Sequence, residues 1–151
     1  MTLRFNKANK FQQLLQDSGY TFSLKDLNAS LQDLSFISKF EEINVVFLSS
    51  KKIKGLNQKF RGKNEVTDVL AFNIDKQRSI GDIYICIEYI QKFQKNAAEI
   101  VDEIIRLIIH GMLHLAGYEH KGYLKESSNQ EEEMFIKQER ILNKVLEKVV
   151  K

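Results

Sequence analysis

Residues 110–120 read His110-Gly111-Met112-Leu113-His114-Leu115-Ala116-Gly117-Tyr118-Glu119-His120 and contain all three histidines of the chain. Residues four apart lie on one face of an α-helix, so His110 and His114 can direct their imidazoles to one point. Gly117 can adopt the left-handed conformation that ends a helix and turns the chain back. This turn would return His120 to the same point. The stretch therefore predicts a helix that ends beside a metal-binding site.

The spacing H-x-x-x-H-x-x-G-x-x-H is that of the metzincin zinc proteases, in which a glutamate follows the first histidine. Gly111 takes that place here, so the pattern indicates a metal site without the proteolytic base. The three ligands His110, His114 and His120 favour one Zn²⁺ per chain, although nickel, copper or iron would also accept imidazoles. They leave a fourth position for water, as in catalytic zinc sites, where the metal activates that water. The alternative is three ordinary histidines near a helix end.

The composition predicts one domain, residues 1–151, because 43% apolar residues can supply a core for a chain of this length. The net charge of +3 permits a polyanionic partner without requiring one. We expect Cys86, the single cysteine, to be a buried reduced thiol. Residues 1–10 contain no apolar run of signal-peptide length, and no stretch has the length of a membrane span. We therefore expect a cytoplasmic protein without membrane contact.

Apolar runs, alternation and turn residues predict the strands, and helical spacing of apolar residues predicts the helices. We expect strands over Thr2–Asn6, Ile43–Leu48, Val69–Ile74 and Ile80–Ile87. The last two should form an antiparallel hairpin, and Ile43–Leu48 should be an interior strand. We expect helices from a Ser23 cap to before Phe40, over Ser50–Phe60, over Glu88–Asn96, from Glu99 through Leu115, and over Glu131–Val150 after a loop at Lys121–Asn129.

The helix from Glu99 is apolar around most of its circumference, as expected of a helix buried in the core. Its polar stripe consists of Arg106, His110 and His114, and we interpret Arg106 as a residue that reaches solvent. In the last helix we expect Met134 to belong to the core. The order of elements predicts an α+β fold, in which a small mixed sheet is packed by helices.

The run HGMLHLAGYEH, with Arg61-Gly62-Lys63, Thr67-Asp68-Val69-Leu70-Ala71-Phe72 and Gly81-Asp82-Ile83, resembles the YbeY family of bacterial endoribonucleases, also called rRNA maturation factors. The resemblance covers nearly the whole chain, and its most specific motif departs from the family only at Glu119, where Asp is usual. It implies a compact four-stranded fold with the metal in a cleft. It also implies cleavage of single-stranded RNA in the maturation of the small-subunit rRNA 3′ end and in ribosome quality control. Its partners would be precursor rRNA, the small ribosomal subunit and assembly proteins.

Phosphoryl transfer needs positive charge near the phosphate, and a guanidinium can hold a phosphate with two parallel hydrogen bonds. Arg61 matches a family position implicated in function, so we expect Arg61 and His114 to be the catalytic residues. Asp68 and Asp82 are either acceptors for the second ring nitrogens of the metal ligands or acceptors at a turn and a strand end. For the lysines of the helix over Ser50–Phe60 we favour a solvated face over a phosphate-contacting patch; they are Lys51, Lys52, Lys54 and Lys59.

Two other classes of protein explain part of the pattern. A metalloprotease would explain the ligand spacing, but the chain lacks the glutamate that takes the proton from water. A non-catalytic ribosome-assembly factor, with the metal as a structural staple, would explain the family context. In that case a fourth protein ligand would close the metal site.

Overall fold

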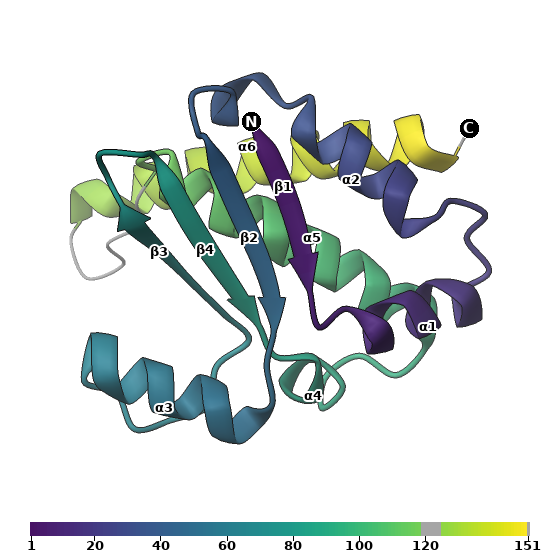
Figure 1. Ribbon diagram of the computed structural model, residues 1–151, viewed down its shortest axis with the longest axis horizontal. Coiled ribbons are helices and arrows are strands. Elements are labelled where there is room, and N and C mark those ends of the chain that lie inside the picture. Colours follow the sequence, from purple (N-terminus) through teal and green to yellow (C-terminus); the bar gives the residue numbers. More distant parts are fainter. Residues whose placement is uncertain (119–124, 151) are drawn as a thin grey trace.

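The computed structural model contains a mixed sheet of four strands (Figure 1). It describes the backbone of residues 1–118 and 125–150 and the side chains of residues 1–118 and 133–150. The strands are β1 (Thr2–Asn6), β2 (Glu42–Phe47), β3 (Val69–Asp75) and β4 (Ile80–Ile85). Their order in space is β1-β2-β4-β3. The pairs β1–β2 and β2–β4 are parallel, whereas β3 and β4 form an antiparallel hairpin. The predicted hairpin and the interior position of β2 are confirmed.

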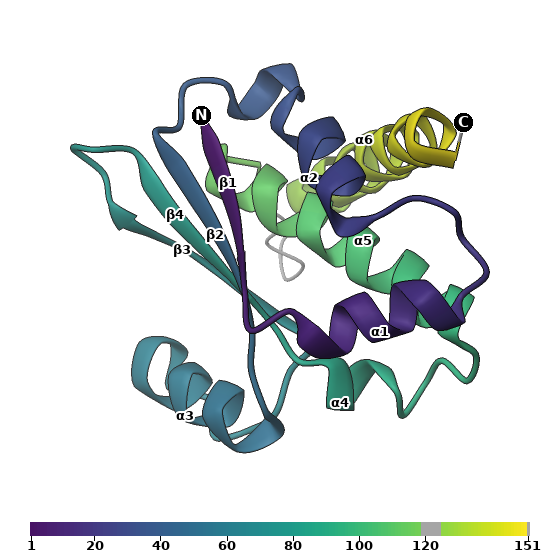
Figure 2. The ribbon, with the colours of Figure 1, turned by 45° about the vertical axis from the view of Figure 1, so that its right-hand side comes forward.

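The described helices are α1 (Asn9–Asp17), α2 (Leu24–Gln32), α3 (Ser50–Arg61), α4 (Ile87–Ile90), α5 (Ala97–Leu115) and α6 (Lys125–Val150), with a short 3₁₀ turn at Ser35–Ile37. Figure 2 shows α1, α2, α5 and α6 on one side of the sheet. The α+β fold is therefore confirmed. Among the described residues, no helix combines the length and apolar character needed to cross a bilayer.

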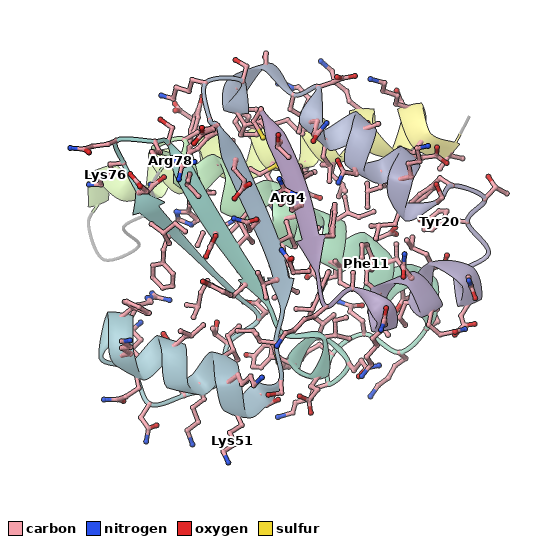
Figure 3. The ribbon with its side chains drawn as sticks, viewed as in Figure 1. Arg4, Phe11, Tyr20, Lys51, Lys76 and Arg78 are labelled. Atoms are coloured by element: carbon pink, nitrogen blue, oxygen red, sulfur yellow. The ribbon has the colours of Figure 1, made fainter. Side chains whose placement is uncertain are left out.

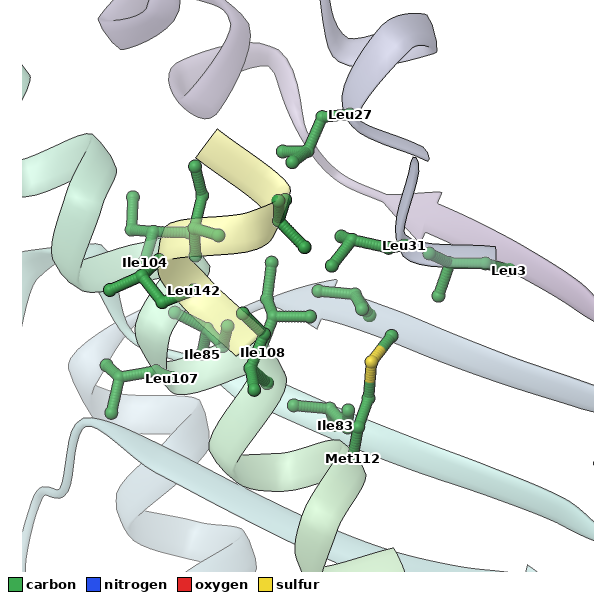
Figure 4. Packing of buried hydrophobic residues seen from close by; sticks show 14 of the residues in the cluster. Leu3, Leu27, Leu31, Ile83, Ile85, Ile104, Leu107, Ile108, Met112 and Leu142 are labelled. Atoms are coloured by element: carbon green, nitrogen blue, oxygen red, sulfur yellow. The ribbon is translucent and has the colours of Figure 1, made fainter. Parts of the chain in front are cut away.

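The core lies between the sheet and α5. Strand β2 buries every second residue, namely Ile43, Val45 and Phe47, so one face of the sheet is apolar. Helix α5 is buried on most sides, as predicted, and packs against β3, β4, α1 and α6. Figure 4 shows Ile108 and Met112 of α5 among side chains from the sheet, α2 and α6. Met134 of α6 is buried in the same core, and Cys86 is buried in a smaller cluster under α3, both as predicted.

Several predicted boundaries are wrong. The helix capped by Ser23 ends at Gln32 instead of continuing towards Phe40, because Leu34 is extended and the chain then makes the 3₁₀ turn that buries Ile37. The capping box between Ser23 and Asp26 is nevertheless present. Helix α1 has no counterpart in the prediction, because only two of its residues, Phe11 and Leu15, are buried.

Two further helices differ from the prediction. The predicted helix over Glu88–Asn96 is only α4, and Asn96 instead caps α5 by accepting the Glu99 N–H at 2.8 Å. Helix α6 begins at Lys125, so the predicted loop is wrong for residues 125–129, while residues 121–124 lie outside the described residues. The polar residues that open α6 give no apolar periodicity from which a helix start can be inferred.

Two glycines allow α5 to approach β4 closely. A Cβ atom on Gly111 would lie 2.9 Å from Cγ2 of the buried Ile83, and one on Gly81 would lie 2.6 Å from Cδ1 of Leu115. Both distances are shorter than ordinary van der Waals contact. At Gly111 the backbone of α5 therefore lies against Ile83 of the sheet, and Gly81 leaves space for the side chain of Leu115.

We expect Gly111→Ala to lower the free energy of unfolding by about 1 to 2 kcal/mol, because overpacking against Ile83 outweighs the gain in helix propensity. The matched control is Gly55→Ala in α3, where an added Cβ meets nothing within 4 Å. This control should raise the free energy of unfolding by up to about 1 kcal/mol. Urea denaturation of the parent and of both variants measures the change in the free energy of unfolding, which should be negative for Gly111→Ala and positive for Gly55→Ala. Equal stabilisation by both substitutions would contradict the close approach of α5 to β4.

Candidate metal centre and cleft

Helix α5 brings two of the three histidines together. His110 and His114 lie one turn apart, with their ring centroids 4.6 Å apart and their ring planes at 77°. Their Nε2 atoms are 3.0 Å apart. Both imidazoles therefore direct the same ring nitrogen to one point, as the spacing predicts.

Gln138 of α6 determines which nitrogen of His110 carries the proton. The Gln138 amide nitrogen donates to Oε2 of Glu139 at 3.1 Å, which leaves Oε1 of Gln138 as the acceptor 2.7 Å from His110 Nδ1. His110 Nδ1 must therefore be the donor, and the lone pair of the neutral ring lies on Nε2. That lone pair faces His114. In metal sites, such an acceptor behind a histidine fixes the ring and its tautomer.

The pair of nitrogens fits a metal ion. A lone pair on His110 Nε2, 3.0 Å from His114 Nε2, requires either a proton or a cation between the two rings. Ligand nitrogens around a tetrahedral zinc ion lie about 3.3 Å apart, close to the distance found here. Neutral imidazole is also the commonest protein ligand of transition metals. The described donors are therefore suited to zinc or a similar ion.

Helix α5 ends in the turn that the sequence predicts. Gly117 has a φ of 101°, its N–H donates to the His114 carbonyl, and the Tyr118 N–H donates to the Leu113 carbonyl. This pair of bonds is a Schellman motif, which directs the chain away from the helix axis. His120 and Glu119 lie outside the described residues, so the third ligand stays a prediction. Residues with described side chains contain no group of three or more potential metal ligands.

A cleft of about 430 Å³ opens beside the histidines. It is lined by Arg61 at the end of α3, by residues 67–72 leading into and along β3, and by His110, Gly111 and His114 of α5. Strand β3, which lines the cleft, is an edge strand of the sheet. Gly62, with a φ of 70°, ends α3 directly after Arg61. The structure thus brings Arg61 and the two histidines to the same cleft.

The Arg61 side chain is exposed. Among the residues with described side chains, no carboxylate forms an ion pair with its guanidinium. Within this part of the chain, the donors of the guanidinium are not held by a carboxylate and can contact an anion in the cleft.

The two aspartates considered as acceptors have different surroundings. Asp68 lines the cleft, where its carboxylate accepts from the Thr67 hydroxyl at 3.4 Å. Asp82 accepts from Asn44 at 3.1 Å and from the Tyr84 hydroxyl at 2.6 Å. Burial and the bond to Asp82 raise the pKa of Tyr84. The described contacts of Asp82 are thus those of a strand residue, which favours the structural interpretation over a role behind a metal ligand.

Arg106, the third member of the polar stripe, forms ion pairs with Glu103 at 2.8 Å and with Glu139 at 2.9 Å. Its side chain remains 33% exposed, so it reaches solvent as expected. Because Glu139 also accepts from Gln138, one hydrogen-bonded chain joins Arg106 to His110 across α5 and α6.

The sequence reasoning missed Gln138. This residue is 8% exposed and occupies a core position of α6, four residues after Met134 and four before Leu142. A buried polar residue in an apolar helical stripe needs a partner, because an unpaired polar group in the core is unfavourable. The polar residue at a core position was the signal in the sequence that Gln138 has a buried partner.

The chain is similar to known proteins over most of its length. The family described as "Endoribonuclease YbeY" matches residues 6–146. A protein of that name from Phytoplasma australiense is 39% identical over 147 residues, covering 92% of this chain and 88% of the relative. One from Borreliella burgdorferi is 39% identical over 137 residues, covering 82% of each. The solution structure of a Thermotoga maritima protein superposes with a TM-score of 0.59 at 31% identity, covering 96% of this chain and 89% of that one.

The α+β domain, with paired histidines beside a cleft, is related to these proteins and is a hydrolytic enzyme that acts on RNA. The chain belongs to the YbeY family of endoribonucleases.

We expect His114→Ala to reduce bound metal from about one equivalent per chain towards zero, because two imidazoles hold a divalent ion far more weakly than three. Elemental analysis of the purified protein measures this. Undiminished metal in the variant would show that the three histidines do not form the site.

We expect Gln138→Leu to weaken metal binding by about 10- to 100-fold, because the Nδ1–H of His110 loses its acceptor. The matched control is Gln58→Leu, the same substitution at an exposed position of α3, which should bind zinc like the parent. Competition with a fluorescent zinc chelator measures both dissociation constants. If Gln138→Leu binds zinc as tightly as the parent, Gln138 does not support the metal site.

Proposed function

We propose that residues 1–151 form one metal-dependent endoribonuclease domain that cleaves single-stranded RNA. Its role would be maturation of the 3′ end of small-subunit rRNA and ribosome quality control. The observation that carries this proposal is the convergence of Arg61, His110 and His114 on one cleft of about 430 Å³. Family membership supplies the reaction, since the relatives are named as endoribonucleases.

The residues that would hold the metal are His110, His114 and His120, with zinc favoured and nickel or another divalent transition metal as alternatives. A metal with an open position polarises a phosphate oxygen and lowers the pKa of a bound water. Gln138 would keep the Nδ1 proton on His110, so that the Nε2 lone pair stays directed into the cleft.

Arg61 would bind the phosphate next to the bond that is cleaved. A guanidinium forms two parallel hydrogen bonds to a phosphate and stabilises the charge that develops during cleavage. This role requires an arginine without a carboxylate partner at the cleft wall, which agrees with the described contacts of Arg61. His114 is the second residue of the proposed catalytic pair, since it lines the cleft opposite residues 67–72.

The proposed partners are precursor rRNA, the small ribosomal subunit and assembly proteins, and the proposed location is the cytoplasm. A metalloprotease has one observation in its favour, because the free edge of β3 beside the cleft is a place where an extended peptide can pair. Gly111 argues against it. A glutamate there, as in the proteases, would meet Ile83 at the Cβ atom, so the packing of α5 leaves no room for that base.

The experiment that tests the proposal is incubation of metal-loaded and chelator-treated protein with a structured precursor rRNA and with casein. Cleavage of single-stranded segments of the RNA by the metal-loaded protein alone is the expected result. A protein that holds its metal ion tightly but cleaves no RNA would favour the assembly factor. Degradation of casein would favour the protease.

We expect Arg61→Lys to lower the rate of RNA cleavage on the order of a hundredfold, because lysine keeps the charge but loses the planar fork. Metal content and melting temperature should stay unchanged. Arg78→Lys is the matched control, since Arg78 is an exposed arginine of the β3–β4 hairpin that pairs with Glu41. If Arg61→Lys cleaves RNA like the parent and the control, the two-bond phosphate contact is wrong.

A further inference from the structure

The end of α3 combines positive charge with an exposed aromatic ring. Residues 50–63 contain six cationic side chains and no acidic one, in a chain whose net charge is only +3. Figure 3 shows Lys51, at the start of α3, pointing away from the sheet. The last turn of α3 carries Lys59 and Arg61 on either side of Phe60, whose exposed fraction is 56%. Phe60 thus presents an aromatic ring to solvent between two cations, a combination that can stack on a base and contact a phosphate.

Phe60 packs against a residue that lines the cleft. Its ring centroid lies 5.1 Å from that of Phe72, and the planes are tilted by 46°. Phe72 lines the cleft together with Arg61 and the two histidines. By their spacing, Ile53, Leu56 and Phe60 share one face of α3, but among them only Ile53 is fully buried. The ring of Phe60 therefore extends the cleft wall outward as an open aromatic surface.

Exposure alone does not make such a surface, and the chain offers a direct comparison. Phe93 is 65% exposed and packs against Tyr89 at 5.3 Å with a tilt of 50°, almost as Phe60 packs against Phe72. Neither Phe93 nor Tyr89 lines the cleft. The difference between the two pairs is their position relative to Arg61 and the histidines.

We propose that Phe60, supported by Phe72, is a stacking subsite for one nucleobase of single-stranded RNA, next to the phosphate held by Arg61. Successive bases of single strands stack on aromatic side chains while cations follow the phosphates. The Lys59 ammonium lies 5.2 Å from the centre of the Phe60 ring. This flexible cation leaves the ring when a base stacks there and contacts the adjoining phosphate. The inference rests on the proposed function for the identity of the ligand, and it adds the part of the site that recognises an unpaired base.

The test compares Phe60→Leu, Phe60→Tyr and the matched control Phe93→Leu. Leucine keeps apolar bulk against Phe72 but lacks a ring face, whereas tyrosine keeps the face. The probe is a short fluorescein-labelled single-stranded oligoribonucleotide, intact or with one abasic position moved along the strand. Anisotropy in the presence of chelator measures binding without cleavage, and cleavage by the metal-loaded protein gives KM and kcat.

We expect Phe60→Leu to weaken binding of the intact strand by about tenfold and to raise KM with little change in kcat. Phe60→Tyr and Phe93→Leu should bind like the parent. When the abasic position is the one that would stack on Phe60, the parent should also lose about tenfold in affinity. On that strand, Phe60→Leu should bind no more weakly than the parent. If Phe60→Leu weakens binding of the intact strand and of every abasic strand by the same factor, the subsite is wrong. It is also wrong if Phe60→Leu binds the intact strand as tightly as the parent.

The two proposals fail in different ways. If the parent protein cleaves RNA but substitution of Phe60 leaves its affinity for the strand unchanged, the endoribonuclease function is retained and the subsite is wrong. If affinity for the intact strand depends on the ring of Phe60 but the metal-loaded protein does not cleave RNA, the subsite is retained and the proposed reaction is wrong.

Discussion

The close contact between α5 and β4 is the constraint on which the site depends. Gly111 against Ile83 and Gly81 against Leu115 let the helix backbone lie against the sheet. The apolar sides of α5 are then buried, and its remaining polar stripe is directed to the cleft and to α6. The position of His110 and His114 at the cleft is therefore a consequence of how the core is packed.

Helix α6 completes this arrangement from the other side. Its apolar residues hold it on α5 through the main core, and among them Gln138 replaces a hydrophobic side chain. Burying an amide is favourable only when both of its polar atoms are paired, and here His110 and Glu139 supply the partners. The docking of α6 thus stabilises the fold and fixes the tautomer of a candidate ligand through the same contact.

The sequence contains the local half of this information. Histidine spacing, the turn at Gly117, the buried character of α5 and the Ser23 cap follow from periodicity and backbone preference, and the structure has each of them. The contact between His110 and Gln138 joins residues 28 positions apart, so no local pattern contains it. The exposure of Phe60 likewise does not follow from the sequence, because helical spacing says which residues share a face but not how far a neighbouring element covers that face.

Selection of single strands follows from the same edge of the sheet under the proposed function. The cleft is lined by β3, an edge strand, by the end of α3 and by α5. A base can stack on Phe60 only after it has left its own helical stack, which is least unfavourable in loops and unpaired ends of RNA. Arg61, next to Phe60 in the chain and at the cleft wall, would then contact the phosphate of that same nucleotide. Recognition of an unpaired base and positioning of its phosphate are thus coupled through one turn of α3.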